Sequence, residues 1–155
     1  MIAGALFPMA QVSEAYNQSL GSVDFPVIYQ NSSHITYLDE SSIIQLENTP
    51  DYILWAQVQI PVDNGNQGIP YTRIFYYPTT DAYGSTHPAY IGKTRIILPP
   101  YVGENIAFYS DDLGSSWKPF DIRNGAGTNA EVYEGFKRGL ESPNNNPFNG
   151  LKKYV

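Results

Sequence analysis

The sequence predicts an α+β fold that is mostly β, with an antiparallel sheet of about five to seven strands and one amphipathic helix laid across a face of it. Three observations predict this fold. The composition combines 13 tyrosines, 13 glycines and 12 prolines with only 15% charged residues, which is typical of strands joined by tight turns. Apolar residues alternate along Tyr52–Ile60, as they do in a strand. They recur with helical spacing along Asn129–Leu140.

The first strands are weaker patterns. Val23–Val27 alternates around Pro26, and a proline is tolerated best at a sheet edge, so we expect an edge strand there. His34–Leu38 predicts a second strand, and Ser41–Ile44 predicts a short connecting element.

The central strand Tyr52–Ile60 has one continuous apolar face, while Gln57 and Gln59 lie on the other. The loop Asp63–Gly68 has the residues of a hairpin turn, so Tyr71–Tyr77 is expected to return antiparallel to it.

The remaining elements follow a loop over residues 78–88. Lys93–Leu98 predicts a strand that ends at two prolines, and residues 106–109 and 117–122 predict the last hairpin. The helix is expected to begin with a capping box of Thr128 and Glu131. One face of it would carry the apolar side chains Val132, Tyr133, Phe136 and Leu140.

The chain divides into three parts. Residues 1–15 predict a shortened export signal without a basic start, or else an apolar N-terminal arm. Residues 16–142 form a single β-rich domain, and residues 143–155 a polar tail too polar to pack. We therefore expect a secreted or envelope protein if the signal is real, and a cytoplasmic one otherwise.

Composition excludes several classes of function. The net charge is −6 and the nine lysines and arginines are scattered, so no basic stripe for nucleic acid is expected. The absence of cysteine excludes disulfides, thiolate catalysis and cysteine-held metals. No apolar stretch approaches the ~20 residues of a transmembrane helix. No cofactor or metal site is predicted.

The octet Ser110–Trp117 directly follows an apolar strand pattern and combines acidic, glycine and tryptophan residues. It resembles the Asp-box, a hairpin-turn motif of sialidases, related sugar-active propellers and some microbial ribonucleases. The resemblance implies a structural role for Ser110, Asp112, Gly114 and Trp117. Asp112 would accept backbone N–H bonds, Gly114 would take a positive φ and Trp117 would return to the core.

A complete sialidase is excluded, because 155 residues with one such motif cannot hold an array of blades. The guanyl-specific ribonucleases are more similar, since Arg95-Ile96-Ile97 precedes Asp112 at a comparable interval. Leu113 stands where that family has its histidine acid, however, and tyrosines stand where its glutamate base would be sought. The resemblance therefore implies topology without the acid and base that RNA cleavage needs.

The two histidines lie in separate segments, so the sequence shows no local metal pair. Both are expected to be solvated, His87 in a loop. A catalytic couple of His34 with Asp39, or of His87 with Asp81, stays open. The loop Asp63–Gly68 is interpreted as a turn and not as a calcium site.

The best candidates for ligand binding are exposed tyrosines and one arginine, which offer stacking faces and hydrogen bonds to a protein or glycan. They are Tyr76, Tyr77, Tyr83, Tyr90 and Arg95. A weaker similarity, from Tyr37–Ile43 and Ile53–Trp55, is to small secreted bacterial domains of the surface-adhesin E type. We therefore expect a non-enzymatic exported or envelope-associated bacterial binding module. A ribonuclease-like enzyme and a purely structural subunit are the alternatives.

Overall fold

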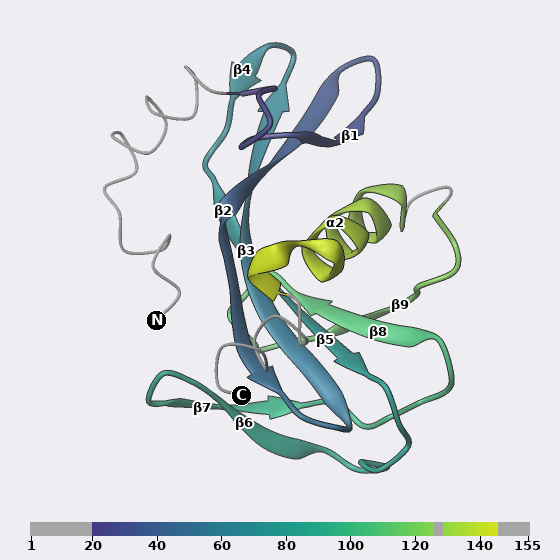
Figure 1. Ribbon diagram of the computed structural model, residues 1–155. Coiled ribbons are helices and arrows are strands. Elements are labelled where there is room, and N and C mark those ends of the chain that lie inside the picture. The colour runs from purple at the N-terminus through teal and green to yellow at the C-terminus, as the bar shows by residue number, and fades with distance from the viewer. Residues whose placement is uncertain (1–19, 126–128, 146–155) are drawn as a thin grey trace.

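The computed structural model describes residues 20–125 and 129–145. Their centre is a seven-stranded antiparallel sheet in the order β1-β2-β3-β5-β8-β9, with the short β4 paired to β3. The sheet curls around one long helix, α2 (Ala130–Glu141), and a separate two-stranded hairpin lies on its other side (Figure 1). This confirms the predicted α+β, mostly β fold.

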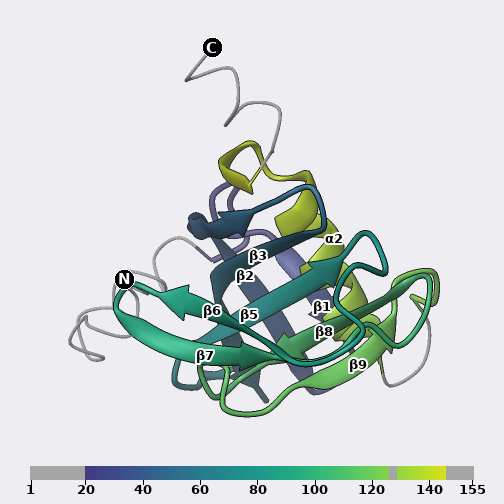
Figure 2. The same cartoon turned by 90° about the horizontal axis from the view of Figure 1, so that it is seen from below.

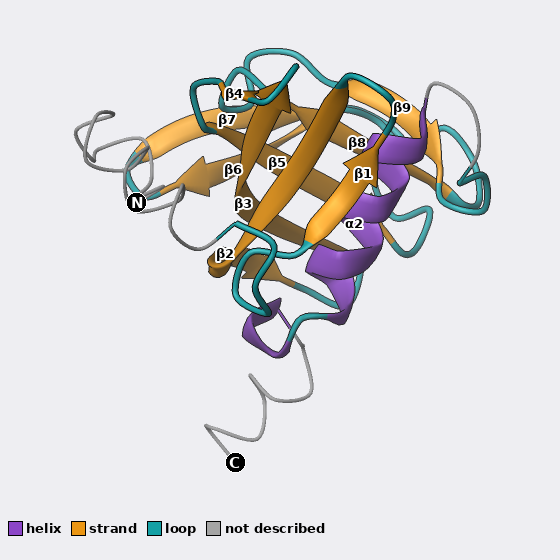
Figure 3. Cartoon of the chain, turned by 90° about the horizontal axis from the view of Figure 1, so that it is seen from above, coloured by secondary structure: helices purple, strands orange, loops and turns teal. Residues whose placement is uncertain are grey.

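The strands of the sheet are β1 (Val27–Gln30), β2 (His34–Asn48), β3 (Tyr52–Asp63), β4 (Asn66–Gln67), β5 (Tyr71–Pro78), β8 (Ile106–Ser110) and β9 (Lys118–Asp121). The separate hairpin is β6 (His87–Ile91) and β7 (Thr94–Leu98), and a short 3₁₀ turn, η3 (Pro143–Asn145), follows α2. Figure 2 shows the hairpin across one face of the sheet, and Figure 3 shows α2 next to β1 on the opposite face.

Two expectations about the first strands were wrong in detail. The edge strand begins at Val27, after Pro26, and not at Val23. Ser41–Ile44 is not a connecting element but the middle of the long strand β2. The pairing of β2 with β3 shifts register between Asp39 and Ile44, so the polar stretch is accommodated as an irregularity within the strand.

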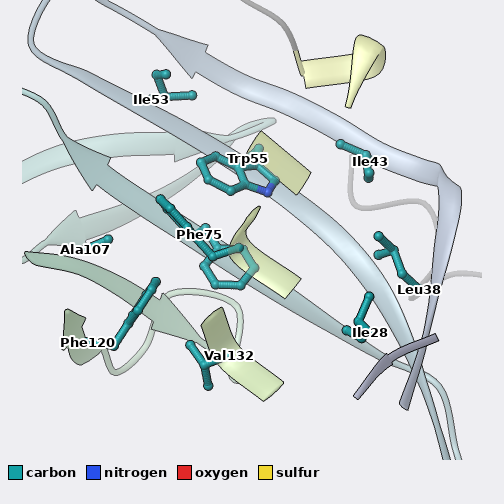
Figure 4. Close-up of a cluster of buried hydrophobic side chains, with 10 residues drawn as sticks. Ile28, Leu38, Ile43, Ile53, Trp55, Phe75, Ala107, Phe120 and Val132 are labelled. Carbon is teal, nitrogen blue, oxygen red and sulfur yellow. The ribbon is translucent and has the colours of Figure 1, made fainter. Parts of the chain in front are cut away.

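The sheet has a core on each side. On the hairpin side, residues of β3 and β5 pack against the inner face of β6 and β7; the buried members are Tyr52, Leu54, Ala56, Ile74, Tyr76, Ala89, Ile96, Leu98 and Phe108. On the helix side, Phe75 packs against both Trp55 and Phe120 (Figure 4). Phe136 of α2 contacts all three rings. Because both faces are covered, β3 is buried over most of its length.

Gln57 and Gln59 are fully buried, although they lie on the face of β3 that the sequence marks as polar. They form a ladder of hydrogen bonds beneath α2. Trp55 Nε1 donates to Gln57 Oε1 (3.0 Å), Gln57 Nε2 to Gln59 Oε1 (3.1 Å), and Gln59 Nε2 to the Tyr71 hydroxyl (3.0 Å). Gln57 also donates to the Gly135 carbonyl (3.0 Å). Each buried amide is thus hydrogen-bonded, which offsets the free-energy cost of removing it from water.

Two glycines of α2 allow this close approach. A Cβ at Gly135 would stand 2.8 Å from Gln59 Oε1, and one at Gly139 would stand 2.5 Å from Trp55 Nε1 and collide with Gln57. The buried face of α2 is accordingly Val132, Gly135, Phe136 and Gly139, while Tyr133 and Leu140 are only partly buried. The predicted apolar stripe placed Val132 and Phe136 correctly but left out the glycines.

The start of the polar tail packs, contrary to expectation. Asn145 is fully buried, donates to the Gly139 carbonyl (3.2 Å) and accepts from Gln45 Nε2. Residues 1–19, with the predicted export signal, and 146–155 lie outside the described residues. None of the helices in the described ranges is long and apolar enough to span a bilayer.

Candidate functional site

The predicted binding tyrosines do not form one surface. Tyr76 is buried on the hairpin side, where its hydroxyl lies 3.0 Å from His87 Nε2. The next residue, Tyr77, faces the opposite side and packs edge-on against Phe136. Tyr83, in the loop before β6, stacks on His87 with ring centroids 3.8 Å apart. Tyr76 is therefore a core residue, Tyr77 is partly buried beside the helix-side core, and Tyr83 is exposed.

His87 is not the solvated loop residue that the sequence suggests. It begins β6, is buried, and is surrounded by the rings of Tyr52, Tyr76 and Tyr83. Burial lowers its pKa, which favours the neutral imidazole. Its hydrogen-bond partner is the Tyr76 hydroxyl, and in the described part of the chain no aspartate pairs with it, so the couple with Asp81 is not formed.

Tyr90 and Arg95 do lie together. They are cross-strand neighbours on the outward face of the β6–β7 hairpin, beside the neighbouring pair of Pro88 and Ile97. All four are exposed, Tyr90 to 54% and Ile97 to 41%. Of the inward residues of the same strands, His87, Ala89, Ile96 and Leu98 are buried. The outward residues Pro88, Tyr90, Arg95 and Ile97 are called the hairpin face below.

The turn between β8 and β9 is closed by its own side chains. Asp112 accepts bonds from the Ser116 N–H (2.9 Å), the Ser116 hydroxyl (2.5 Å) and the Ser110 hydroxyl (2.7 Å). These bonds lower the pKa of Asp112 to about 2, with the Ser116 hydroxyl as the largest cause. Gly114 has φ +90° and its N–H donates to the Ser110 hydroxyl (2.8 Å). Leu113 is exposed and also has a positive φ, 57°.

Trp117 ties this turn to the hairpin. Its indole N–H donates to the Ile97 carbonyl (2.9 Å), and its ring packs, partly buried, against the hairpin-side core. The sequence predicted a largely buried ring, whereas the ring is only partly buried.

We expect Trp117→Ala to lower the free energy of unfolding by about 3 kcal/mol, at the low end for aromatic truncation because the ring is only partly buried. Trp117→Phe keeps the packing and removes the indole hydrogen bond, so it should cost about 1 kcal/mol. Urea unfolding measures both. Equal stability of parent and alanine variant would show that the turn does not need this anchor.

A cluster of charged side chains on the helix side was missed by sequence reasoning. His34 Nδ1 lies 2.6 Å from Asp63 Oδ1, and His34 Nε2 lies 3.1 Å from Glu131 Oε2. The Thr36 hydroxyl donates a short bond to the same Glu131 oxygen and lies 2.8 Å from His34 Nε2. Glu131 therefore reaches down from α2 to β2. Its predicted capping partner, Thr128, lies outside the described residues.

The cluster continues to β5 through Arg73, whose side chain is only 6% exposed. Nε and one terminal nitrogen donate to the two oxygens of Asp111, both at 2.8 Å. The guanidinium carbon lies 4.7 Å from the Tyr109 ring centre and 5.4 Å from that of Tyr71. The other terminal nitrogen, Nη1, is buried with no hydrogen-bond partner and lies 3.6 Å from Glu131 Oε1. We call His34, Asp63, Arg73, Asp111 and Glu131 the charged cluster.

Part of this cluster had a signal in the sequence. Arg73 interrupts an otherwise apolar and aromatic strand, which marks an inward charge that needs a partner. The pairing of His34 with Asp63 follows from the register of β2 on β3, in which the two residues are direct neighbours. That register is not readable from the sequence, and the considered couple with Asp39 is replaced by Asp63.

Beside the cluster, a hollow of about 180 Å³ shares Asp111 with it; its lining is Tyr109, Ser110, Asp111, Asp112, Ser116 and Lys118. Among the described residues, no three His, Asp or Glu side chains are placed to hold a metal ion. Comparisons with protein-family models, curated proteins and solved structures found no match to this chain. The hairpin face and the charged cluster are the two candidate functional sites of the described residues.

Proposed function

We propose that the protein is a non-enzymatic binding module, of the exported or envelope-associated kind, that contacts a protein partner through the hairpin face. The carrying observation is the exposed cross-strand pair of Tyr90 and Arg95 beside Pro88 and Ile97. Tyrosine and arginine are the residues that most often dominate binding energy at protein interfaces. The buried inner face of the hairpin holds these side chains in place before a partner arrives.

The charge of the hairpin supports a protein partner of acidic character. Residues 87–98 contain Lys93 and Arg95 and no carboxylate, whereas the whole chain has a net charge of −6. A local cationic surface with apolar neighbours suits carboxylates that flank an apolar patch. Two cations on an acidic protein are too few to hold a nucleic acid.

The test places a photo-crosslinking phenylalanine analogue at Tyr90, with the same analogue at the exposed loop residue Val102 as the control. Crosslinking in the producing cells should give a defined protein adduct from position 90 only. Arg95→Ala should remove that adduct without changing the circular dichroism spectrum. Adducts of equal yield from both positions, or none from position 90, would contradict the proposal. Glycan-array binding lost in Tyr90→Ala would make the partner a glycan instead.

A ribonuclease-like enzyme is the second candidate, and one observation favours it: His34, Glu131 and Arg73 converge on one face of the sheet. The same geometry argues against turnover. His34 and Glu131 bind each other, and Arg73 is held by both oxygens of Asp111. Arg95, which begins the Arg95-Ile96-Ile97 stretch that resembles the ribonucleases, lies on the hairpin face. The similarity to Asp-box proteins remains a prediction about the turn.

Purified protein is therefore expected not to cleave RNA above the rate of a Glu131→Gln variant, because acid and base are already engaged with each other. The measurement is release of fluorescence from a quenched oligoribonucleotide. Cleavage that disappears in both Glu131→Gln and His34→Gln, with the fold intact by circular dichroism, would promote the enzyme over the binding module. Arg95→Ala should change partner binding and no turnover.

A further inference from the structure

The first turn of α2 is attached to the sheet by Glu131. One of its oxygens takes bonds from two residues of β2, His34 and Thr36, and the other faces Arg73 of β5. His34 itself is held on its far side by Asp63 of β3. The imidazole thus stands between two carboxylates from different elements, at 2.6 Å and 3.1 Å.

Counting protons shows that these contacts need a charged histidine. An imidazolium donates from both ring nitrogens, so it satisfies Asp63 and Glu131 together, and the Thr36 hydroxyl adds a second donor for Glu131. A neutral imidazole has one N–H. If that proton stays toward Asp63, the bare Nε2 and Glu131 Oε2 are both acceptors, and only the Thr36 hydroxyl is left to serve them.

A second position for Glu131 already exists. Arg73 Nη1 is buried without a hydrogen-bond partner, and Glu131 Oε1 is 3.6 Å away, just too far for a good hydrogen bond. In the present arrangement the carboxylate is drawn toward His34 and Thr36. Released from His34, it can shift by a few tenths of an ångström and bind the guanidinium. The two arrangements compete for one side chain of the helix.

We propose that His34 is a proton-operated latch: its imidazolium fastens the first turn of α2 to β2 through Glu131, and loss of the proton breaks this bond, so that Glu131 shifts toward Arg73 of β5 and the turn is held less tightly on β2. The latch goes beyond the proposed binding function, since it concerns the opposite face of the sheet. The charged, titratable and aromatic groups around His34 are Asp63 of β3, Glu131 of α2, Arg73 of β5, Asp111 after β8 and the ring of Tyr29 in β1.

The direction of the pH dependence follows from these neighbours. The bond to Asp63 is the main cause that raises the pKa of His34 above its ordinary value, burial opposes it, and Glu131 adds to it. A histidine whose folded-state pKa lies above about 6.5 contributes its stability in full below about pH 6.5. That contribution is lost as the pH rises through the folded-state pKa. The latch is therefore closed at acid pH and opens as the pH rises through the folded-state pKa of His34.

The test combines two NMR measurements on the whole protein. The first is the titration of His34, which should have a pKa above 6.5 that falls in Glu131→Gln and in Asp63→Asn. Glu141→Gln, an exposed carboxylate on the same helix, is the matched control and should leave it unchanged. The buried His87 should titrate below 6.5 in every variant, which reports that the fold is intact.

The second measurement is hydrogen exchange of the Glu134, Gly135 and Phe136 amides, which donate to carbonyls of the first turn of the helix. Their protection factors should fall about tenfold as His34 loses its proton, which corresponds to the loss of one hydrogen bond between the helix and β2. In Glu131→Gln this fall should be absent. A His34 pKa at or below 6.5, or protection that stays constant through the His34 titration in the parent protein, would overturn the latch.

Discussion

Replacing Gly139 by alanine is expected to lower the free energy of unfolding by about 3 kcal/mol, despite the gain of about 1 kcal/mol in helix propensity. The added methyl group would collide with Gln57 and stand 2.5 Å from the Trp55 indole nitrogen. Neither can retreat, because both are buried and bonded to each other. Moving α2 outward instead would break the bond from Gln57 to the Gly135 carbonyl.

Gly84→Ala is the matched control, since nothing lies within 4 Å of a Cβ at that position. Its effect should stay within about 0.5 kcal/mol. Gly135→Ala should fall between the two, because it meets the end of the Gln59 side chain at 2.8 Å. Urea unfolding monitored by tryptophan fluorescence gives all three values. A Gly139→Ala protein more stable than the parent would mean that helix and sheet are not in close contact there.

Asp111→Ala is expected to cost about 3 kcal/mol, because it leaves the buried guanidinium of Arg73 with Glu131 alone. The value lies at the low end for a broken buried ion pair, since the side chain of Asp111 is itself 42% exposed. The stacked rings of Tyr71 and Tyr109 keep the arginine from turning to solvent. The free energy of unfolding should therefore fall while the m-value stays unchanged.

The chain contains its own control for this experiment. Asp121 binds Arg123 through both carboxylate oxygens in the same two-bond manner, but Arg123 is 67% exposed. Asp121→Ala should cost much less than Asp111→Ala, because exposed ion pairs contribute little to stability. Equal costs at the two sites would show that burial of Arg73 does not matter, and would argue against a tightly held charged cluster.

The sequence predicted the fold well where local patterns decide the structure. The alternation in β3, the hairpin turn at Asn64-Gly65, where both residues have positive φ, and the helix over residues 130–141 were all predictable. Each depends on residues close in the chain. The same holds for the self-contained bonds of Asp112 with its neighbouring serines.

The candidate site was harder to predict, because its members meet through sheet register. Gln57 and Gln59 follow the pattern of a solvent face, and nothing near them in the chain shows that two glycines of the distant helix α2 would cover them. The charged cluster joins residues 97 positions apart in His34 and Glu131. Tyr76 and Tyr77 had equal claims as binding residues, and only the faces of β5 show that they point to opposite sides of the sheet, Tyr76 fully buried and Tyr77 partly buried.

The hairpin of β6 and β7 forms a two-stranded sheet of its own within the described residues, so both of its outer edges could recruit a strand from another molecule. Pro88 has no N–H to offer such a strand, and the Ile97 carbonyl is already taken by the Trp117 indole. With one donor missing and one acceptor occupied, the outer edges are poorly suited to strand addition and fibril-like growth. A protein that displays such a hairpin can thereby stay monodisperse, and under the proposed binding function a partner would be recognised through side chains and not through main-chain pairing.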